Sequence, residues 1–399
     1  MNVGILTYHF VSNFGANLQT LSTYKNIQNA GHTPIIINWV PEDLEKYYKD
    51  NVSEQQNQAH YAFAQKYYKN ITTVCRTTQD IAREIDSLEI DLVIIGSDAV
   101  FTYIPRLSRF HLCRKGIVYS KPCIDSDFPN PFWGDFISFV KRPIKVAVMS
   151  ASAQNTEYKK IIGKGLKRQF AKAIASFNYL SVRDVWTQNM LSYLTSGEIE
   201  PIITPDPVFA FQYNVNPIKS ECVKRQLKIE GPYALVSLTG KYVNDSWLRE
   251  LEELFTTAGI TLIGLPQTNK PFVTVLKNNL SFPIDPLDWY NIIRESVGYI
   301  GELMHPVLVS LHNSVPVYVF DKYGFKRSGS FDDKSSKTYQ IMKRFELEAN
   351  YYNCLSHSAF PSPKTVCEAI LMFDREKCSK YANMRLEEYK DMMAKILSL

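Results

Sequence analysis

Short apolar runs that end in small or polar residues recur along this chain, separated by amphipathic segments. The first is Val3–Leu6, and after a polar turn the segment Asn17–Ala30 carries apolar residues three or four positions apart. Similar runs are Asp91–Ile95, Lys145–Met149 and Tyr179–Val182. Strands without polar alternation are buried on both faces, as in a parallel sheet covered by helices. The pattern predicts an α/β fold.

A proline-rich segment from Thr204 to Pro217 interrupts this rhythm, which then restarts. A chain of 399 residues is long enough for about two domains. We therefore expect two Rossmann-like parallel-sheet domains, residues 1–207 and 218–355, facing each other across a cleft. Residues 356–399 are expected to form helices that pack back on them. In the second half, the sequence pattern predicts strands at 233–238, 261–264, 299–301 and 315–320, with helices at 245–257, 285–296 and 305–312.

Composition excludes several classes of protein. The net charge of +5 over this length is too weak to indicate nucleic-acid binding, although it is compatible with anionic substrates or an anionic membrane surface. The seven cysteines are scattered and form no C-x-x-C pair, which favours reduced thiols. No signal peptide or convincing membrane span is evident. We expect a cytoplasmic protein that can associate peripherally with the inner face of the cell membrane.

Ligands of open α/β sheets bind beyond the carboxyl ends of the strands, so the residues that follow each strand are the candidates for a site. After the first strand come Asn13, Gly15, Asn17 and Gln19. Gly15 allows close backbone approach, and the amide side chains suit sugar hydroxyls. The alternative is an ordinary turn in which an asparagine caps the helix. Neither a G-x-G-x-x-G fingerprint nor a Walker A lysine motif is present.

Two further strand ends carry polar groups. Ser97 and Asp98 follow the strand that ends at Ile95, and a carboxylate at this position can bind hydroxyls or position a base. Arg183 follows the strand that ends at Val182, where a guanidinium can clamp a phosphate or carboxylate. The alternatives are a helix cap for Asp98 and a structural salt bridge for Arg183.

In the second half, Gly301-Glu302-Leu303-Met304-His305 joins a strand to a short helix. The helix dipole is expected to lower the pKa of His305, which then serves as an acid or base. The alternative is a satisfied structural histidine. His312 lies seven residues further on, too far for a metal pair, and no third ligand is evident, so we predict no zinc site.

Together these motifs resemble the polysaccharide pyruvyl transferase family. The resemblance runs in order from Met1 to about Glu346. It rests on five elements: Gly4-Ile-Leu-Thr-Tyr8 with the following Asn-x-Gly-Ala-x-Leu-Gln19, Ile95-Gly-Ser-Asp98, Ser181-Val-Arg-Asp184, Pro205-Asp-Pro207, and Gly301-Glu-x-x-His305 with Val315-Pro316.

The resemblance implies a fold similar to the two-domain glycosyltransferase B type. It also implies transfer of pyruvate from phosphoenolpyruvate onto two sugar hydroxyls as a cyclic ketal, in cell-surface polysaccharide biosynthesis. Arg183 and His305 would be catalytic, Arg183 binding the donor and His305 acting as the acid or its partner. The residues expected to bind substrate are Asn13, Gly15, Asn17, Gln19, Ser97, Asp98, Lys241 and Glu302. The expected partners are phosphoenolpyruvate as co-substrate and a sugar or lipid-linked oligosaccharide acceptor, without a further cofactor, a metal or nucleic acid.

The chain departs from the family at one position. Many members have Arg-x-His where this chain has Leu303-Met304-His305. Either another cation replaces that arginine, with Lys241, Lys322, Lys326 and Arg327 as candidates, or the donor differs. Two alternatives therefore stay open: a nucleotide-sugar-dependent glycosyltransferase of the same fold, and a non-catalytic sugar-binding relative.

Overall fold

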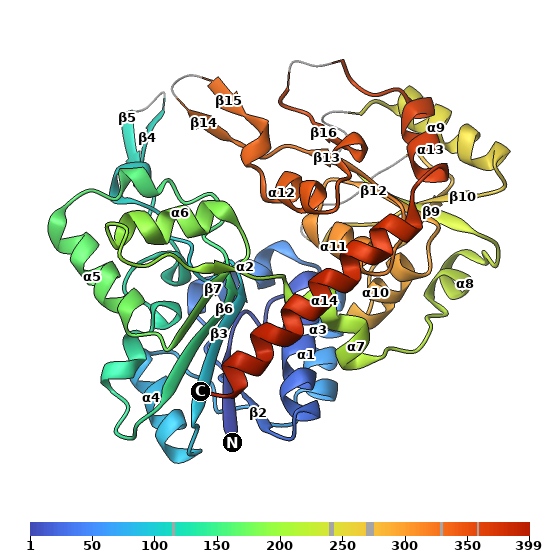
Figure 1. Ribbon diagram of the computed structural model, residues 1–399. Helices are drawn as coiled ribbons and strands as arrows, with labels where there is room; N and C mark the ends of the chain where they lie inside the picture. Colours follow the sequence, from blue (N-terminus) through green and yellow to red (C-terminus); the bar gives the residue numbers. More distant parts are fainter. Residues whose placement is uncertain (114–115, 239–242, 269–274, 328–329, 357–358) are drawn as a thin grey trace.

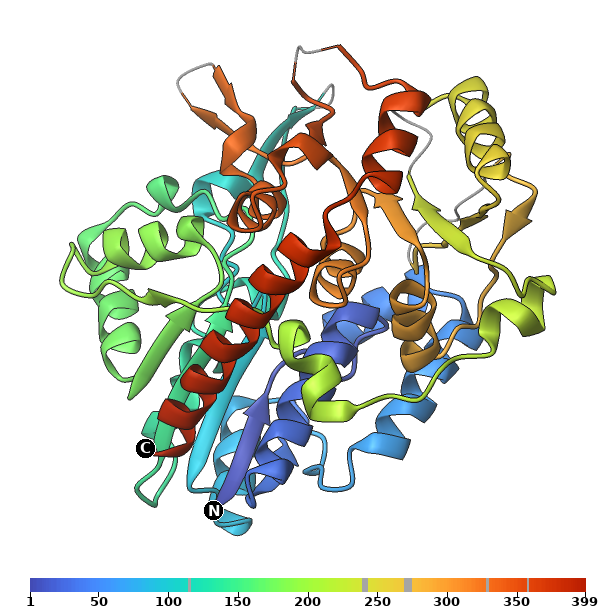
Figure 2. The same ribbon diagram turned by 45° about the vertical axis from the view of Figure 1, so that its right-hand side comes forward.

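Two six-stranded sheets, one in each half of the chain, form the framework of the protein (Figures 1 and 2). The computed structural model describes residues 1–113, 116–238, 243–268, 275–327, 330–356 and 359–399. Every strand pair within the two sheets is parallel. The predicted α/β architecture with two parallel-sheet domains is therefore confirmed.

The first sheet has its lowest-numbered strands toward one edge and helices on both faces. In spatial order its strands are β2 (Thr33–Ile36), β1 (Asn2–Leu6), β3 (Leu92–Asp98), β6 (Lys145–Ala151), β7 (Tyr179–Val182) and β8 (Ile202–Ile203). Its helices are α1 (Phe14–Asn29), α2 (Glu42–Asn51), α3 (Glu54–Tyr67), α4 (Thr78–Ser87), α5 (Lys164–Ala175) and α6 (Val185–Leu194).

The second sheet repeats this organisation. Its strands are β11 (Asn278–Asn279), β10 (Thr261–Gly264), β9 (Tyr233–Ser237), β12 (Gly298–Gly301), β13 (Val317–Asp321) and β16 (Tyr351–Asn353). The helices of this half are α8 (Cys222–Leu227), α9 (Asp245–Thr257), α10 (Pro286–Arg294), α11 (Met304–His312), α12 (Lys337–Arg344) and α13 (Pro363–Leu371). Two small antiparallel pairs, β4 (Phe110–Cys113) with β5 (Gly116–Tyr119) and β14 (Phe325–Arg327) with β15 (Ser330–Asp332), lie outside the sheets.

The proline-rich segment between the halves, whose residues the sequence marks as poor helix formers, contains two short helical turns with buried side chains. Asp206 accepts a hydrogen bond from the Val208 amide and so caps a 3₁₀ turn at Pro207–Ala210. The turn leads into α7 (Phe211–Val215), and both pack against α1. Phe211 is completely buried. Burial of these apolar side chains overrides the weak helix propensity of the segment.

The last helix, α14 (Arg375–Leu397), crosses from the second half to the first (Figure 2). It contacts α11 at one end, while near its other end Met392 packs against Ser150 and Ser181 of the first sheet. Among the described residues, no helix combines the length and hydropathy needed to cross a bilayer.

The two halves also meet through α1, α3 and α10. The ring of Phe14 stacks on Trp289 with 4.8 Å between centroids. The fully buried side chain of Gln56 donates a hydrogen bond to the Ile284 carbonyl and accepts one from the Ile284 amide, at 2.9 and 2.8 Å. One side chain of the first half thus satisfies two backbone groups of the second.

We expect Gln56→Met to lower the free energy of unfolding by about 2 kcal/mol, because both backbone groups of Ile284 lose their buried partner. Denaturant unfolding monitored by tryptophan fluorescence measures this loss. Gln55→Met is the matched control, since Gln55 is the exposed neighbour on the same helix. Equal stability of the two variants would show that this contact does not hold the halves together.

Candidate active site between the two sheets

Arg183 stands at the centre of a buried ion-pair network at the end of β7. Its Nη1 contacts Asp206 Oδ2 at 2.9 Å and its Nη2 contacts Asp98 Oδ1 at 3.1 Å. Only 7% of the Arg183 side chain is exposed. Burial alone would raise the pKa of Asp98, but Arg183 and then His305 hold this pKa below its usual value. Both Asp98 and Arg183 are therefore charged.

The backbone at Asp98 is also unusual. Its φ of +98° lies in the left-handed region, which residues other than glycine rarely adopt. Such strained positions persist where the surrounding structure holds them, and they cluster at functional sites. Asp98 Oδ1 also accepts a hydrogen bond from the Ala99 amide at 2.8 Å, which fixes the direction of the carboxylate.

His305 faces this network from the second half. It is the second residue of α11, and the backbone of Gly15 lies against its ring. A Cβ added at Gly15 would be 2.1 Å from His305 Cγ, so only glycine permits this contact. Burial lowers the pKa of His305, with Arg183 and Lys337 acting in the same direction and Asp98 and Asp206 opposing them. Its Nε2 is buried and has no hydrogen-bond partner among the described residues.

A cavity opens over these groups. It brings together four predicted site residues from distant parts of the chain: Asn13, Asp98, Arg183 and His305. Tyr8, Tyr48 and Asp125 line it on the side of the first half, and Lys337 lines it on the side of the second. We call this the His305 cavity.

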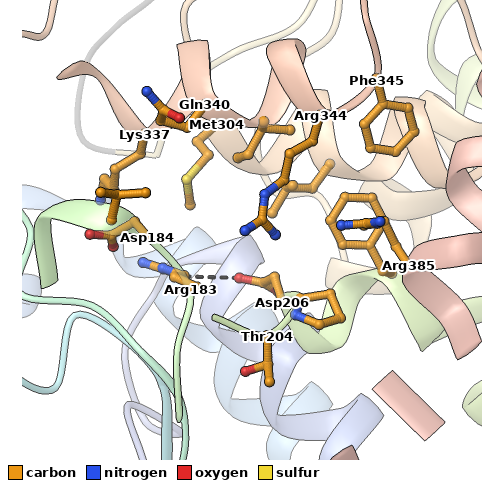
Figure 3. Close-up of a pocket in the computed structure, with 15 residues that line it drawn as sticks. Arg183, Asp184, Thr204, Asp206, Met304, Lys337, Gln340, Arg344, Phe345 and Arg385 are labelled. Atoms are coloured by element: carbon orange, nitrogen blue, oxygen red, sulfur yellow. Dashed lines mark hydrogen bonds and ion pairs between the residues drawn. The ribbon is translucent and has the colours of Figure 1, made fainter. Parts of the chain in front are cut away.

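A second, narrower cavity, drawn in Figure 3, shares part of its lining with the first. Arg183, Met304 and Lys337 line both cavities. The second cavity also contains Arg344 of α12 and Arg385 of α14, and its far wall includes Pro205 and Asp206 of the connecting segment. Because it lies where the two halves are joined, we call it the hinge-side pocket.

Four of the predicted substrate-binding residues are buried and line neither cavity. Asn17 Oδ1 is bonded to His60 Nδ1, and Ser97 donates its hydroxyl hydrogen to the Ser150 carbonyl. Gln19 donates to Asp206 Oδ2, so it orients a carboxylate that binds Arg183. Glu302 forms an ion pair with Lys322 at 2.9 Å. These side chains therefore hold the structure around the site, and their polar groups do not face it.

A family model described as polysaccharide pyruvyl transferase matches residues 13–321. The chain belongs to this family. A search of curated proteins found no match.

Solved structures with the same fold are distant in sequence. UDP-GlcNAc 2-epimerase from Neisseria meningitidis shares 10% identity over 99% of this chain and 100% of that chain, with a TM-score of 0.53. The calicheamicin glycosyltransferase CalG4 (11% identity, 100% and 98% covered, TM-score 0.45) and an α,α-trehalose 6-phosphate synthase from Burkholderia multivorans (10%, 100% and 98%, TM-score 0.46) are also similar. The chain thus shares a two-domain α/β fold with the Neisseria meningitidis epimerase.

The cation expected to replace the family arginine at Leu303 is not among the described candidates. Lys322 is paired with Glu302, Lys241 lies outside the described residues, and the side chains of Lys326 and Arg327 are likewise not described. Leu303 itself caps α11 without a side-chain hydrogen bond and lines neither cavity. Lys337 is the described lysine that lines both cavities.

Sequence reasoning missed Lys337 and Arg344 because it missed α12. The signal was present: Ser336 caps the helix by accepting a hydrogen bond from the Thr338 amide, and the segment is strongly amphipathic. The helix is only eight residues long and lies beyond the segment that matches the family.

Proposed function

We propose that this protein transfers pyruvate from phosphoenolpyruvate onto two hydroxyls of a sugar, forming a cyclic ketal during cell-surface polysaccharide biosynthesis. The observation that carries the proposal is the convergence of a histidine, two carboxylates and two cations on the His305 cavity, in a chain of the polysaccharide pyruvyl transferase family. Phosphoenolpyruvate carries a phosphate and a carboxylate, and its enol carbon must be protonated. The cavity therefore offers the group types that this reaction needs.

Lys337 is the cation we assign to the donor in place of the missing arginine. Arg183 is already paired with two aspartates, so part of its charge is neutralised. No hydrogen bond or ion pair from the described part of the chain ends on the Lys337 amine, which is thus available to an anionic ligand. Lysine binds phosphate as a point charge and does not need the bidentate geometry of arginine.

His305 is the group we assign to proton donation. Because its pKa is lowered mainly by burial, the empty site holds a neutral imidazole. An anionic donor bound between Arg183 and Lys337 offsets the two cations that lower this pKa, and so favours the imidazolium. His305 then protonates the methylene carbon of the enol phosphate, and the two acceptor hydroxyls form C–O bonds at the adjacent carbon as its C–O bond to phosphate breaks. Of the two hydroxyl protons, one returns to His305 and the other leaves with the phosphate.

The first half provides the acceptor side in this proposal. Tyr8 donates a hydrogen bond to Asp125 Oδ2 at 2.7 Å, and both line the His305 cavity beside Tyr48. Aromatic faces and carboxylates suit the apolar faces and hydroxyls of a sugar. We assign the oxygen of Asp98 that does not contact Arg183 to accept a hydrogen bond from an acceptor hydroxyl. We expect the sugar to be presented on a lipid-linked oligosaccharide at the membrane surface.

Thermal unfolding with candidate donors tests the choice of donor. A ligand at a hundred times its Kd stabilises the folded state by about 2.7 kcal/mol, enough for a Tm increase of several degrees. We expect this increase with phosphoenolpyruvate and not with nucleotide sugars. The opposite result would favour the glycosyltransferase alternative, which the fold of the chain also permits.

The pH dependence of donor capture tests the role of Lys337. Burial, followed by the charge of Arg183, lowers the pKa of its amine to about 8. The charged form that binds the donor exists below this pKa, so we expect kcat/KM for phosphoenolpyruvate to fall as the pH rises through about 8. Lys337→Met should lower kcat/KM at pH 7 roughly ten- to hundredfold and abolish this alkaline decline. Lys343→Met, on an exposed residue of the same helix, is the control. An unchanged alkaline decline in Lys337→Met would assign the titration to another group.

A further inference from the structure

The hinge-side pocket contains cationic side chains that the protein neutralises only in part. They are Arg183, Lys337, Arg344 and Arg385, and the carboxylates of the lining are Asp184 and Asp206. Asp98 and Asp206 pair with Arg183, and Glu388 pairs with Arg385. Within the described ranges, no ion pair ends on Lys337 or Arg344. Lys337 also lines the His305 cavity, whereas Arg344 lines the hinge-side pocket alone.

Both carboxylates are fully engaged with other groups. The two oxygens of Asp206 accept hydrogen bonds from Arg183, Gln19 and the Val208 amide. The oxygens of Asp184 accept from Ser152 and from the amide and hydroxyl of Thr187. Neither carboxylate is left to pair with the arginines of the two helices.

Of the two helix arginines, Arg344 is the less compensated. Within the described ranges, no hydrogen bond or ion pair ends on the Arg344 guanidinium, which points from α12 toward Asp206 and Arg183 (Figure 3). Arg385 is paired with Glu388 at 2.7 Å, but its Nε is buried and has no described partner. Burial and then the nearby Arg385 lower the pKa of Arg344, and Glu388 opposes them. The protein thus offsets the repulsion between the two arginines only in part, and a bound anion would offset it further.

We propose that the hinge-side pocket is a binding site for the phosphoryl group of an organic phosphate, with Arg344 and Arg385 as its principal ligands. A phosphoryl group offers three acceptor oxygens, and guanidinium groups approaching from two different helices can each donate to it in bidentate fashion. A carboxylate has only two oxygens and would leave part of this donor set unused.

The rest of the pocket indicates that the ligand has an organic part. Phe209, Leu308, Ile341 and Phe345 line it alongside the arginines. Such a wall is suited to an apolar or planar group attached to the phosphate. The site also contacts the first half through Arg183, the second half through α12, and α14 through Arg385. A bound phosphate would therefore link all three parts of the molecule.

The inference does not depend on pyruvyl transfer. Arg344 and Arg385 lie outside the segment that matches the family, and an organic phosphate could be the donor itself or a second phosphorylated ligand. The shared chemistry is the phosphoryl group, and titrations with different probes distinguish its source.

Isothermal titration calorimetry of the full chain with inorganic pyrophosphate tests the site. We expect Arg344→Met to weaken binding roughly ten- to hundredfold, the usual effect of losing a charge-assisted bond. Lys343→Met removes the same charge from an exposed position on the same helix and should bind as the native chain does. Arg385→Met provides a second, independent variant. Because Arg344 has no described ion-pair partner, Arg344→Met should keep or raise the Tm of the ligand-free protein.

Phosphoenolpyruvate and UDP titrated into the same variants identify the source of the phosphate. If Arg344→Met weakens the binding of phosphoenolpyruvate as much as that of pyrophosphate, the donor occupies the pocket. If the variant weakens only the binding of pyrophosphate or UDP, the pocket binds a second ligand. Equal pyrophosphate affinity in the native chain, Arg344→Met and Arg385→Met would overturn the inference, and this result would leave the proposed pyruvyl transfer standing. If the protein transfers no pyruvate but binds pyrophosphate in a way that depends on Arg344 and Arg385, the proposed function fails and the phosphate site stands.

Discussion

Replacing His305 with glutamine is expected to lower turnover roughly 10²–10⁴-fold, the usual contribution of a general acid. Glutamine fills a similar volume but cannot donate a proton to carbon. The Tm should change little, because His305 Nε2 has no described hydrogen-bond partner to lose. Steady-state kinetics with phosphoenolpyruvate and a sugar acceptor, together with thermal unfolding, measure both quantities.

His312 provides the matched control on the same helix. Its Nε2 is bonded to the Tyr290 hydroxyl at 2.9 Å, and burial lowers its pKa to about 3, so it is neutral and structural. His312→Gln should cost about 1–3 kcal/mol of stability and leave the turnover of the folded protein unchanged. Normal turnover in His305→Gln would show that His305 is not the proton donor.

The second large effect is expected from Gly15→Ala. The new Cβ would lie 2.1 Å from His305 Cγ, and this is the base of the ring, which cannot move without displacing the start of α11. A displacement of about 1 Å at a reacting group can lower turnover on the order of 10²-fold. Overpacking of a tight contact also costs roughly 1–3 kcal/mol. We therefore expect Gly15→Ala to lose both activity and stability, whereas His305→Gln loses activity alone.

Gly165→Ala controls for the added methyl group. Gly165 lies inside α5, and nothing is within 4 Å of its Cβ position. Alanine favours a helix over glycine by about 1 kcal/mol, so this variant should be slightly more stable and fully active. Full activity of Gly15→Ala would show that the close contact with His305 does not position the ring.

Much of the fold could be predicted from local pattern alone. The strands β7 and β10 and the helix α9 have the predicted bounds, because apolar runs and caps mark both ends of each. The sequence also predicts a helix from about Lys159 to Phe177, but α5 begins only at Lys164. Gly163 has a φ of +102°, which is incompatible with a helix, and this interruption is not visible as a periodic signal.

The candidate site was only partly predictable. Strand ends pointed to Asp98, Arg183 and His305, because the edge where parallel strands end is fixed by topology. The same reasoning could not tell which polar side chains turn inward, so it included Asn17, Gln19, Ser97 and Glu302, whose partners come from distant segments. It also could not place Arg385, which reaches the hinge-side pocket only because α14 crosses between the halves.

Incubation with phosphoenolpyruvate labelled in its pyruvyl carbons, together with candidate lipid-linked sugars, tests the central claim most directly. We expect label to appear in the sugar as an acid-labile ketal, with release of one equivalent of phosphate, and we expect His305→Gln to reduce this incorporation at least a hundredfold. The result that would contradict it is transfer of a sugar from a nucleotide sugar to the same acceptors, at a rate that depends on His305, with no label incorporated from phosphoenolpyruvate.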